Sequence, residues 1–286
     1  MTTVEYDEDV ARSARTALAS AGYGAVTAVC GDGAFGWAAA APYDRIIVTA
    51  GAWDVPPAWW DQLADDGVLL VPLRMRGLTR AVALERDGAI LRSRSVEACG
   101  FIPLRGVGAV AEQNVWVRGA DGDLLVRVDD GQPVDTEALG HALDCPATVV
   151  WTGVGFVMPE LLDFWLACLD GFCRVLASRD AVDSGRLVAP VFLWGSMGVY
   201  DGATIAYLTA TEDMSEVGVC AYGPDGAAVA GRVADRIRAW DADGGQRMQV
   251  RVEVWPIDVA PPSEGRLVID KTHSRVVVHT LPADDL

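Results

Sequence analysis

The feature that most constrains the fold is an alternation of short apolar runs with helical patterns in residues 1–72. The apolar runs predict strands at Thr3–Tyr6, Val26–Cys30, Tyr43–Val48 and Val68–Pro72. Asp7 is a good N-cap for a helix that ends before Gly22, and a second helix is expected from Pro56-Pro57 to about Ala64. Strands that alternate with helices predict an α/β fold with a parallel sheet covered on both faces.

The pattern changes after Leu73, where paired strands predominate. Asp87-Gly88 joins two runs, and Ala120–Asp123 joins two more, so both segments predict hairpins. Further strands are predicted at Glu97–Pro103, Val188–Trp194, Ala203–Thr209, Glu216–Ala221, Val250–Trp255, Leu267–Asp270 and Arg275–Thr280. Helices are predicted at Thr136–Leu143, Asp225–Trp240 and, as the longest, Met158–Ala177. We expect two domains, one at residues 1–106 and an α+β domain at 107–286.

The charge of the chain limits its partners. The formal net charge is −17 at pH 7, and such a surface repels phosphate backbones and anionic membrane surfaces. We therefore expect no nucleic-acid or membrane partner. The acidic, polar N-terminus does not have the pattern of a secretory signal, which predicts a cytoplasmic protein. The six cysteines form no Cys-x-x-Cys pair and the three histidines have no zinc-helix spacing, so no metal site is expected.

Candidate binding residues follow the predicted strands directly. An open parallel sheet binds its ligand at the carboxyl ends of its strands. Glu5 ends the first strand, and a carboxylate there can accept hydrogen bonds from ribose hydroxyls; alternatively it is an ordinary solvated glutamate. Asp32 stands between Gly31 and Gly33 after the second strand, where it could accept from an adenine amino group or simply form a turn.

An ordered set of motifs extends over residues 1 to about 106 and strengthens the functional interpretation. Its members are Val4–Asp7, Gly31-Asp32-Gly33 with Gly36-Trp37, Ala41–Ala50, Val55-Pro56-Pro57, Gln62-Leu63, Gly67–Pro72 and Phe101–Leu104. In order and spacing this set resembles the protein-L-isoaspartate O-methyltransferase family. The resemblance implies a Rossmann-like sheet, S-adenosylmethionine as methyl donor and a carboxyl group of a peptide or protein as acceptor. It also implies that Glu5 holds the ribose, that Asp32 and Gly33 meet the adenine, and that Thr49 and Ala50 line the methionine end.

One departure from the family pattern concerns the glycine-rich loop. The family has a strand and a Gly-x-Gly-x-Gly-type loop immediately before the position of Glu5, and this sequence has only four residues there. The sheet is therefore expected to lack its first, central strand and to expose unpaired backbone groups. A misplaced start, a fragment and a degenerate relative each account for this departure.

The expected chemistry demands few catalytic groups. A carboxylate is ionised at neutral pH and needs no general base, and the donor methyl sits on a sulfonium leaving group. Alignment and partial desolvation are then the main tasks of the protein, so no catalytic residue is assigned.

Residues 107–286 resemble the extension of longer relatives that accompany lanthipeptide-like modified peptides. By that resemblance the second domain recognises a peptide, and the candidate contacts are Trp194, Tyr200, Trp240, Lys271 and, foremost, His273 and Arg275. The predicted function is carboxyl methylation of an aspartyl or isoaspartyl group, either as protein repair or as peptide tailoring. The alternative is a catalytically inactive peptide-binding module or a fragment of such an enzyme.

Overall fold

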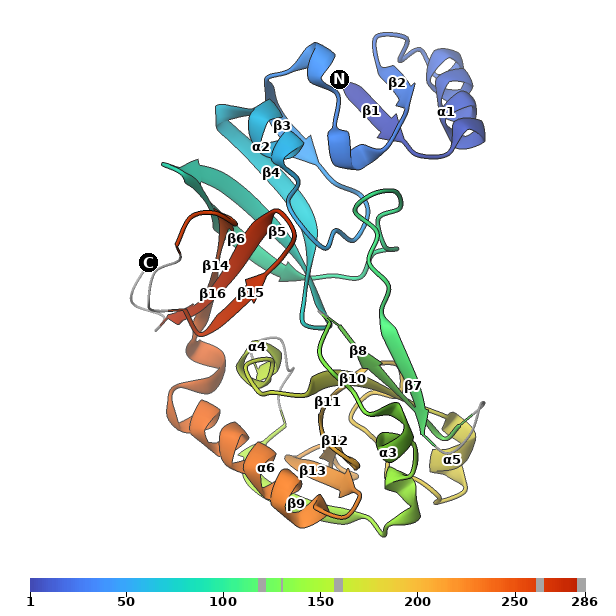
Figure 1. The fold of residues 1–286 in the computed structure, drawn as a ribbon, viewed down its shortest axis with the longest axis vertical. Coiled ribbons are helices and arrows are strands. Elements are labelled where there is room, and N and C mark those ends of the chain that lie inside the picture. Colours follow the sequence, from blue (N-terminus) through green and yellow to red (C-terminus); the bar gives the residue numbers. More distant parts are fainter. Residues whose placement is uncertain (118–121, 130, 157–161, 261–264, 282–286) are drawn as a thin grey trace. The chain divides into compact units, whose positions relative to one another are not determined.

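The computed structural model describes residues 1–117, 122–129, 131–156, 162–260 and 265–281 (Figure 1). The chain forms two compact units. Unit 1 contains Met1–Arg74, Thr79–Val110 and Arg251–His279, and unit 2 contains Met75–Leu78, Ala111–Val250 and Thr280–Leu286. The division predicted at residue 106 therefore differs from the structure, because residues 251–279 return to the first unit, where their strands extend its sheet.

Unit 1 begins with a parallel strand pair and a helix. Strands β1 (Thr2–Glu5) and β2 (Thr27–Cys30) pair in parallel, with Glu5 opposite Cys30, and α1 (Glu8–Ser20) connects them. Asp7 caps α1, because its Oδ1 accepts hydrogen bonds from the amides of Asp9 at 3.0 Å and Val10 at 3.3 Å. The strands and the N-cap predicted for this segment are confirmed.

The main sheet of unit 1 has seven strands in the order β15-β16-β14-β6-β5-β4-β3. Its strands are β3 (Tyr43–Ile47), β4 (Leu63–Met75), β5 (Leu78–Asp87), β6 (Ile90–Ala98), β14 (Gln249–Pro256), β15 (Leu267–Asp270) and β16 (Ser274–Leu281). Helix α2 (Pro57–Gln62) lies between β3 and β4, which pair in parallel, whereas β5 and β6 form the predicted antiparallel hairpin. The predicted α/β fold is confirmed by these parallel pairs and their helices.

Strands β1 and β3 of unit 1 each have one edge without a neighbour among the described residues. β1 pairs with β2 alone, and β3 pairs with β4 alone at the end of the large sheet. Ile47 at the end of β3 is 66% exposed. Two short 3₁₀ turns, η1 (Gly33–Phe35) and η2 (Ala38–Ala40), lie on the connection from β2 to β3.

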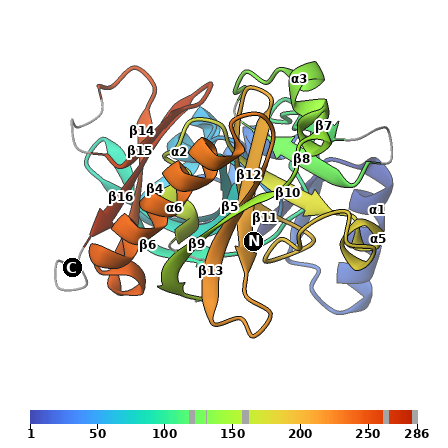
Figure 2. The ribbon, with the colours of Figure 1, turned by 90° about the horizontal axis from the view of Figure 1, so that it is seen from below.

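Unit 2 is built on a seven-stranded antiparallel sheet in the order β7-β8-β10-β11-β12-β13-β9. Its strands are β7 (Gln113–Val117), β8 (Leu124–Val128), β9 (Thr148–Gly155), β10 (Phe172–Ala177), β11 (Ser196–Asp201), β12 (Thr204–Ala210) and β13 (Glu216–Tyr222). Its helices are α3 (Thr136–Gly140), α4 (Leu162–Leu166), α5 (Arg179–Asp183) and α6 (Gly226–Ala242), with the 3₁₀ turns η3 (Ala142–Asp144) and η4 (Gly245–Arg247). Helix α6 packs along β9, β13 and β12, as Figure 2 shows.

The core of unit 2 includes both faces of this sheet. Tyr207 and Cys220 belong to one buried cluster, which also contains Leu139 of α3. Successive side chains of a strand point to opposite faces, and the neighbours Leu208 and Val219 are buried as well. Because both faces of the sheet are buried, the sequences of these strands are almost continuous runs of apolar residues.

Three predicted elements, two in unit 2 and one in unit 1, were wrong or only partly right. Residues 158–161 of the predicted helix Met158–Ala177 lie outside the described residues, and the rest forms the short α4 and strand β10. Val188–Trp194 is not a strand, and Glu97–Pro103 continues β6 only as far as Ala98. The run 158–177 is apolar on every side, and such a run fits a buried helix and a buried strand equally well.

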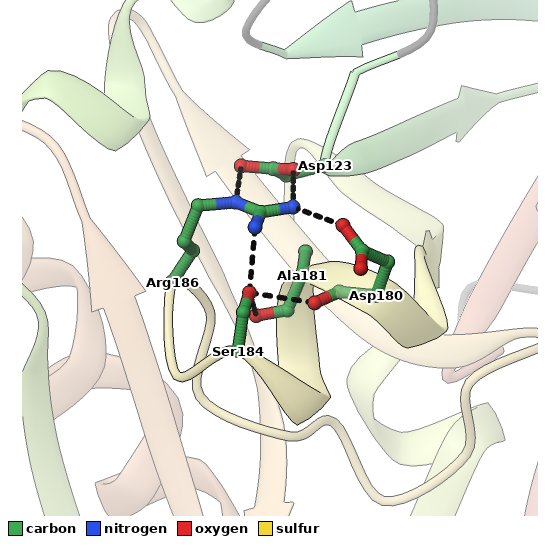
Figure 3. A network of polar contacts seen from close by, with 5 residues as sticks. All are labelled: Asp123, Asp180, Ala181, Ser184 and Arg186. Carbon is green, nitrogen blue, oxygen red and sulfur yellow. Dashed lines mark hydrogen bonds and ion pairs between the residues drawn. The ribbon is translucent and has the colours of Figure 1, made fainter.

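A polar network anchors α5 to the beginning of β8 in unit 2 (Figure 3). The Arg186 guanidinium donates to both carboxylate oxygens of Asp123, at 3.1 and 3.4 Å, and to Asp180 at 2.7 Å. Its remaining nitrogen donates to the Ser184 hydroxyl at 2.6 Å. Planar guanidinium groups suit such bidentate carboxylate pairing, and the network has the geometry of a structural clamp.

Candidate functional site

Glu5 lies at the carboxyl end of β1 and is one-third exposed. Its Oε1 accepts a hydrogen bond from the Asp7 amide at 2.9 Å. Nη2 of Arg105 lies 3.5 Å from the same oxygen, and the exposed fraction of the Glu5 side chain is 34%. The Arg105 guanidinium also lies over the Tyr6 ring, 5.2 Å from its centroid. This carboxylate is thus accessible to a ligand and faces a cation from a distant part of the chain.

Asp32 lies at the carboxyl end of β2 and has backbone partners at both oxygens. Oδ1 accepts from the Ala34 amide at 2.9 Å, and Oδ2 accepts from the Val107 amide at 2.8 Å. Gly106 has a φ of 93°, and a Cβ there would lie 2.1 Å from Asp32 Oδ2. Only glycine allows this approach. Next to Asp32, the Gly33 carbonyl accepts from Trp59 Nε1 at 2.8 Å.

Thr49 and Ala50 follow β3, where Thr49 is exposed and Ala50 is half-buried. The next residue, Gly51, donates to the Ile102 carbonyl at 2.8 Å and accepts from the Leu104 amide at 2.9 Å. Residues 102–107, which we call the crossing segment, therefore contact the loop after β3 as well as Glu5 and Asp32. The crossing segment brings the carboxyl ends of β1, β2 and β3 into one neighbourhood.

Sequence reasoning did not assign Arg105 or Val107 to this site. Phe101–Leu104 belonged to the motif set, but no spacing rule indicated that the next residues would reach Glu5 and Asp32. The contact between Val107 and Asp32 joins residues 75 positions apart. The abundance of carboxylates in the chain gave no reason to pair Arg105 with Glu5 in particular.

His273 lies on the turn between β15 and β16, and Arg275 is the second residue of β16; both belong to unit 1. The His273 amide donates to Asp54 Oδ2 at 2.7 Å, and the residue is exposed. The Arg275 guanidinium donates to both oxygens of Asp270 and, at 2.9 Å, to the Val259 carbonyl. Hydrogen bonds from Arg275 hold the pKa of Asp270 below its ordinary value. Arg275 therefore stabilises the turn in this structure.

Of the remaining candidate contacts, Lys271 lies in unit 1, whereas Trp194, Tyr200 and Trp240 lie in unit 2. Trp240 and Tyr200 are buried, and the Tyr200 hydroxyl donates to the Pro133 carbonyl at 2.8 Å, whereas Trp194 is 76% exposed. Among the described residues, no group of three or more His, Cys, Asp or Glu side chains is placed to hold a metal ion. The same part of the chain contains no helix with the length and apolarity needed to span a membrane.

Parallel strand pairs with acidic side chains at their carboxyl ends are the arrangement with which open α/β sheets bind nucleotide-like cofactors. The family model described as "Protein-L-isoaspartate(D-aspartate) O-methyltransferase (PCMT)" matches residues 1–109. These residues contain Glu5, Asp32, Thr49, Ala50 and the crossing segment, so the whole strand-end neighbourhood lies inside the match.

Two relatives show the extent of the similarity. A protein-L-isoaspartate O-methyltransferase of Methanoregula boonei is 43% identical over 104 residues, which are 36% of this chain and 48% of the relative. Its counterpart from Hyperthermus butylicus is 45% identical over 107 residues, 36% of this chain and 44% of that protein. The chain thus spans about half the length of the curated relatives that it matches.

Two solved structures show a weaker likeness. A protein-L-isoaspartate O-methyltransferase covers 87% of this chain with 17% identity and a TM-score of 0.37. A putative enzyme of the same name from Plasmodium falciparum, in complex with S-adenosyl-L-homocysteine, covers 36% with a TM-score of 0.32. Scores this low leave the fold of this chain to be judged from its own helices and strands.

Proposed function

We propose that the chain is an S-adenosylmethionine-dependent carboxyl O-methyltransferase that acts on an aspartyl or isoaspartyl group of a peptide or protein. The observation that supports it best is the position of Glu5, Asp32, Thr49 and Ala50 around the crossing segment, inside the family match. The proposal includes the cytoplasm as the location, in line with the net charge of −17.

The residues present fit the adenosine half of the donor. Glu5 is accessible at the end of β1, and a carboxylate offers two oxygens to a ribose diol. Each oxygen of Asp32 already accepts one backbone hydrogen bond, but a carboxylate oxygen can accept a second, so Asp32 can still meet an amino group. The donor, when bound, supplies a methyl group on a sulfonium.

The protein's own contribution is alignment and exclusion of water. Glu5 and Asp32 fix one end of the donor, and the loop that begins at Thr49 borders the other end. An acceptor carboxylate is already ionised, so it needs to be placed in line with the methyl group and partly desolvated. This division of work requires no general base, in keeping with the absence of an assigned catalytic residue.

Calorimetric titration with S-adenosylhomocysteine tests the proposal. We expect micromolar binding to the wild-type chain and about 10- to 100-fold weaker binding to Glu5→Ala, because hydrogen bonds to charged groups contribute about 1.5–3 kcal/mol. Glu8→Ala is the matched control, since Glu8 is an exposed carboxylate at the beginning of α1. Equal affinities of wild type and Glu5→Ala would contradict the ribose role.

A second candidate function is a catalytically inactive peptide-binding module. Two contacts favour it: Arg105 faces Glu5, and the Val107 amide occupies one Asp32 oxygen, so part of the donor site is already filled from within the chain. A folded protein that gives no heat with S-adenosylhomocysteine would support this candidate. Peptide tailoring and protein repair are the two uses of the active form, and methylation assays on modified and on isoaspartyl peptides distinguish them.

A further inference from the structure

The β15–β16 turn is fastened to the loop that follows β3, although more than 200 residues separate them in sequence. Asp54 on that loop accepts hydrogen bonds from the His273 amide at 2.7 Å and from the Ser274 hydroxyl at 2.6 Å. Ser274 is fully buried. Both segments belong to unit 1, and the turn lies outside the family match. A part of the chain that the family does not account for therefore borders the candidate site.

This junction brings two cations to a single indole ring. The Arg74 guanidinium lies 4.5 Å from the centroid of Trp53, and Lys271 Nζ lies 5.3 Å from it. Trp53 is buried, so the ring is a fixed platform for both cations. Lys271 is the single lysine of a chain whose net charge is −17. Two cations therefore share one ring in a protein whose net charge is strongly negative.

Backbone contacts hold Trp53, the ring that carries the two cations, close to the end of β3. Trp53 is four residues beyond Thr49, so an extended chain would separate their Cα atoms by at most about 14 Å. The loop cannot swing away from the sheet, because the Ala52 amide donates to the Pro72 carbonyl at 2.8 Å and the Arg74 amide donates to the Ala52 carbonyl at 2.8 Å. The platform thus lies on the side where Thr49 and Ala50 would border the reacting end of the donor.

We propose that Lys271 binds a carboxylate of the acceptor peptide and so positions it at the carboxyl end of β3. This inference deepens the proposed function and rests on it for the identity of the acceptor. An ammonium group pairs with a carboxylate through charge-assisted hydrogen bonds, and the anionic remainder of the protein makes a local cation necessary for an acidic ligand. Lys271 is the residue of the β15–β16 turn that lies over Trp53, whereas Arg275 donates hydrogen bonds to Asp270 and to the Val259 carbonyl.

The single lysine makes a direct test possible. Reductive methylation with ¹³C-formaldehyde labels only Lys271 Nζ and the N-terminal amine, so the Lys271 methyl resonance can be assigned with Lys271→Arg. We expect this resonance to shift on titration with a short isoaspartyl peptide and to stay in place with the same peptide carrying asparagine. A Lys271 methyl resonance whose chemical shift does not change with either peptide at millimolar concentration would overturn the proposal.

Fluorescence anisotropy with the fluorescein-labelled isoaspartyl peptide gives an independent measure. We expect Lys271→Gln to weaken binding about tenfold and Lys271→Arg to keep it within about threefold. Arg232→Gln is the matched control: it also removes one cation, but from an exposed pair with Asp201 in unit 2. Equal weakening by Arg232→Gln would mean that only net charge matters, and would overturn the specific role of Lys271.

Titration with S-adenosylhomocysteine in parallel separates the two ideas. Donor binding together with peptide binding that is indifferent to Lys271 would leave the proposed function standing and refute the role of Lys271. Lysine-dependent peptide binding without donor binding would support the acceptor site and refute the methyltransferase activity of this chain. Unchanged circular dichroism of the variants ensures that a loss of binding is not a loss of folding.

Discussion

Replacing Glu253 with alanine is expected to lower the free energy of unfolding by about 3 kcal/mol. Glu253 on β14 is 3% exposed, and two arginines and a histidine surround its carboxylate. Arg92 Nε and Arg251 Nε lie 3.4 and 3.5 Å from Oε1, and His279 Nε2 lies 3.3 Å from Oε2. Trp255 Nε1 also donates to Oε2 at 3.1 Å. Removal of this shared acceptor would leave buried donors and charges without compensation, which costs more than the pairs themselves contribute.

We place the expected loss at the lower end of the range for buried ion pairs because the arginine side chains are partly exposed, 45% for Arg92 and 30% for Arg251. Urea denaturation followed by circular dichroism measures it. Glu85→Ala is the control, since Glu85 pairs with Arg94 on the same sheet while its side chain is 44% exposed, and about 0.5 kcal/mol is expected there. Losses of equal size in the two variants would show that burial of Glu253 is irrelevant.

The same carboxylate predicts a dependence of stability on pH. Burial alone would raise the pKa of Glu253, but the charge and hydrogen bond of His279, the hydrogen bond from Trp255 and the charge of Arg92 outweigh burial, and the pKa lies below its ordinary value. A lowered carboxyl pKa adds stability above the unfolded-state pKa of about 4.3. This contribution is lost as the pH falls through the folded-state value. Glu253→Gln should therefore flatten the acid limb of the stability curve, as urea midpoints below pH 5 would show.

Local signals in the sequence were enough to predict much of the fold. The helix behind Asp7 followed from a capping side chain and a regular apolar spacing, and the β5–β6 hairpin followed from Asp87-Gly88. Both depend on contacts between residues close in the chain. The failed helix Met158–Ala177 shows the limit, because an apolar run without periodicity carries no information on whether it will be a helix or a strand.

Contacts over long separations decided the rest. The pairing of β14 with β6 brings Glu253 beside Arg92, 161 residues earlier, and it assigns residues 251–279 to the first unit. The candidate site behaves in the same way. Glu5 and Asp32 were predictable as strand-end carboxylates, whereas Arg105, Val107 and the Asp54 anchor of the β15–β16 turn depend on how distant segments meet. No spacing rule predicts such meetings.

Gly171→Ala is expected to cost about 2–5 kcal/mol in unfolding free energy, because it combines two independent penalties. Gly171 has a φ of 73°, which costs an alanine about 1–2 kcal/mol. A Cβ there would also lie 2.0 Å from the Tyr200 carbonyl oxygen, so the junction of β10 with β11 would have to shift, at about 1–3 kcal/mol.

Gly185 offers a matched control for separating the two penalties. It has the same φ of 73° in the same unit, but a Cβ would meet nothing within 4 Å. Gly185→Ala should therefore show the backbone penalty alone, and the difference between the two variants in urea denaturation should give the cost of displacing the Tyr200 carbonyl. The Tyr200 amide donates to the Gly171 carbonyl at 2.9 Å, so this displacement would also strain the hydrogen bond that closes the junction. Equal losses of unfolding free energy in the two variants would mean that β11 shifts without cost. The close approach at Gly171 would then contribute nothing to the stability of unit 2.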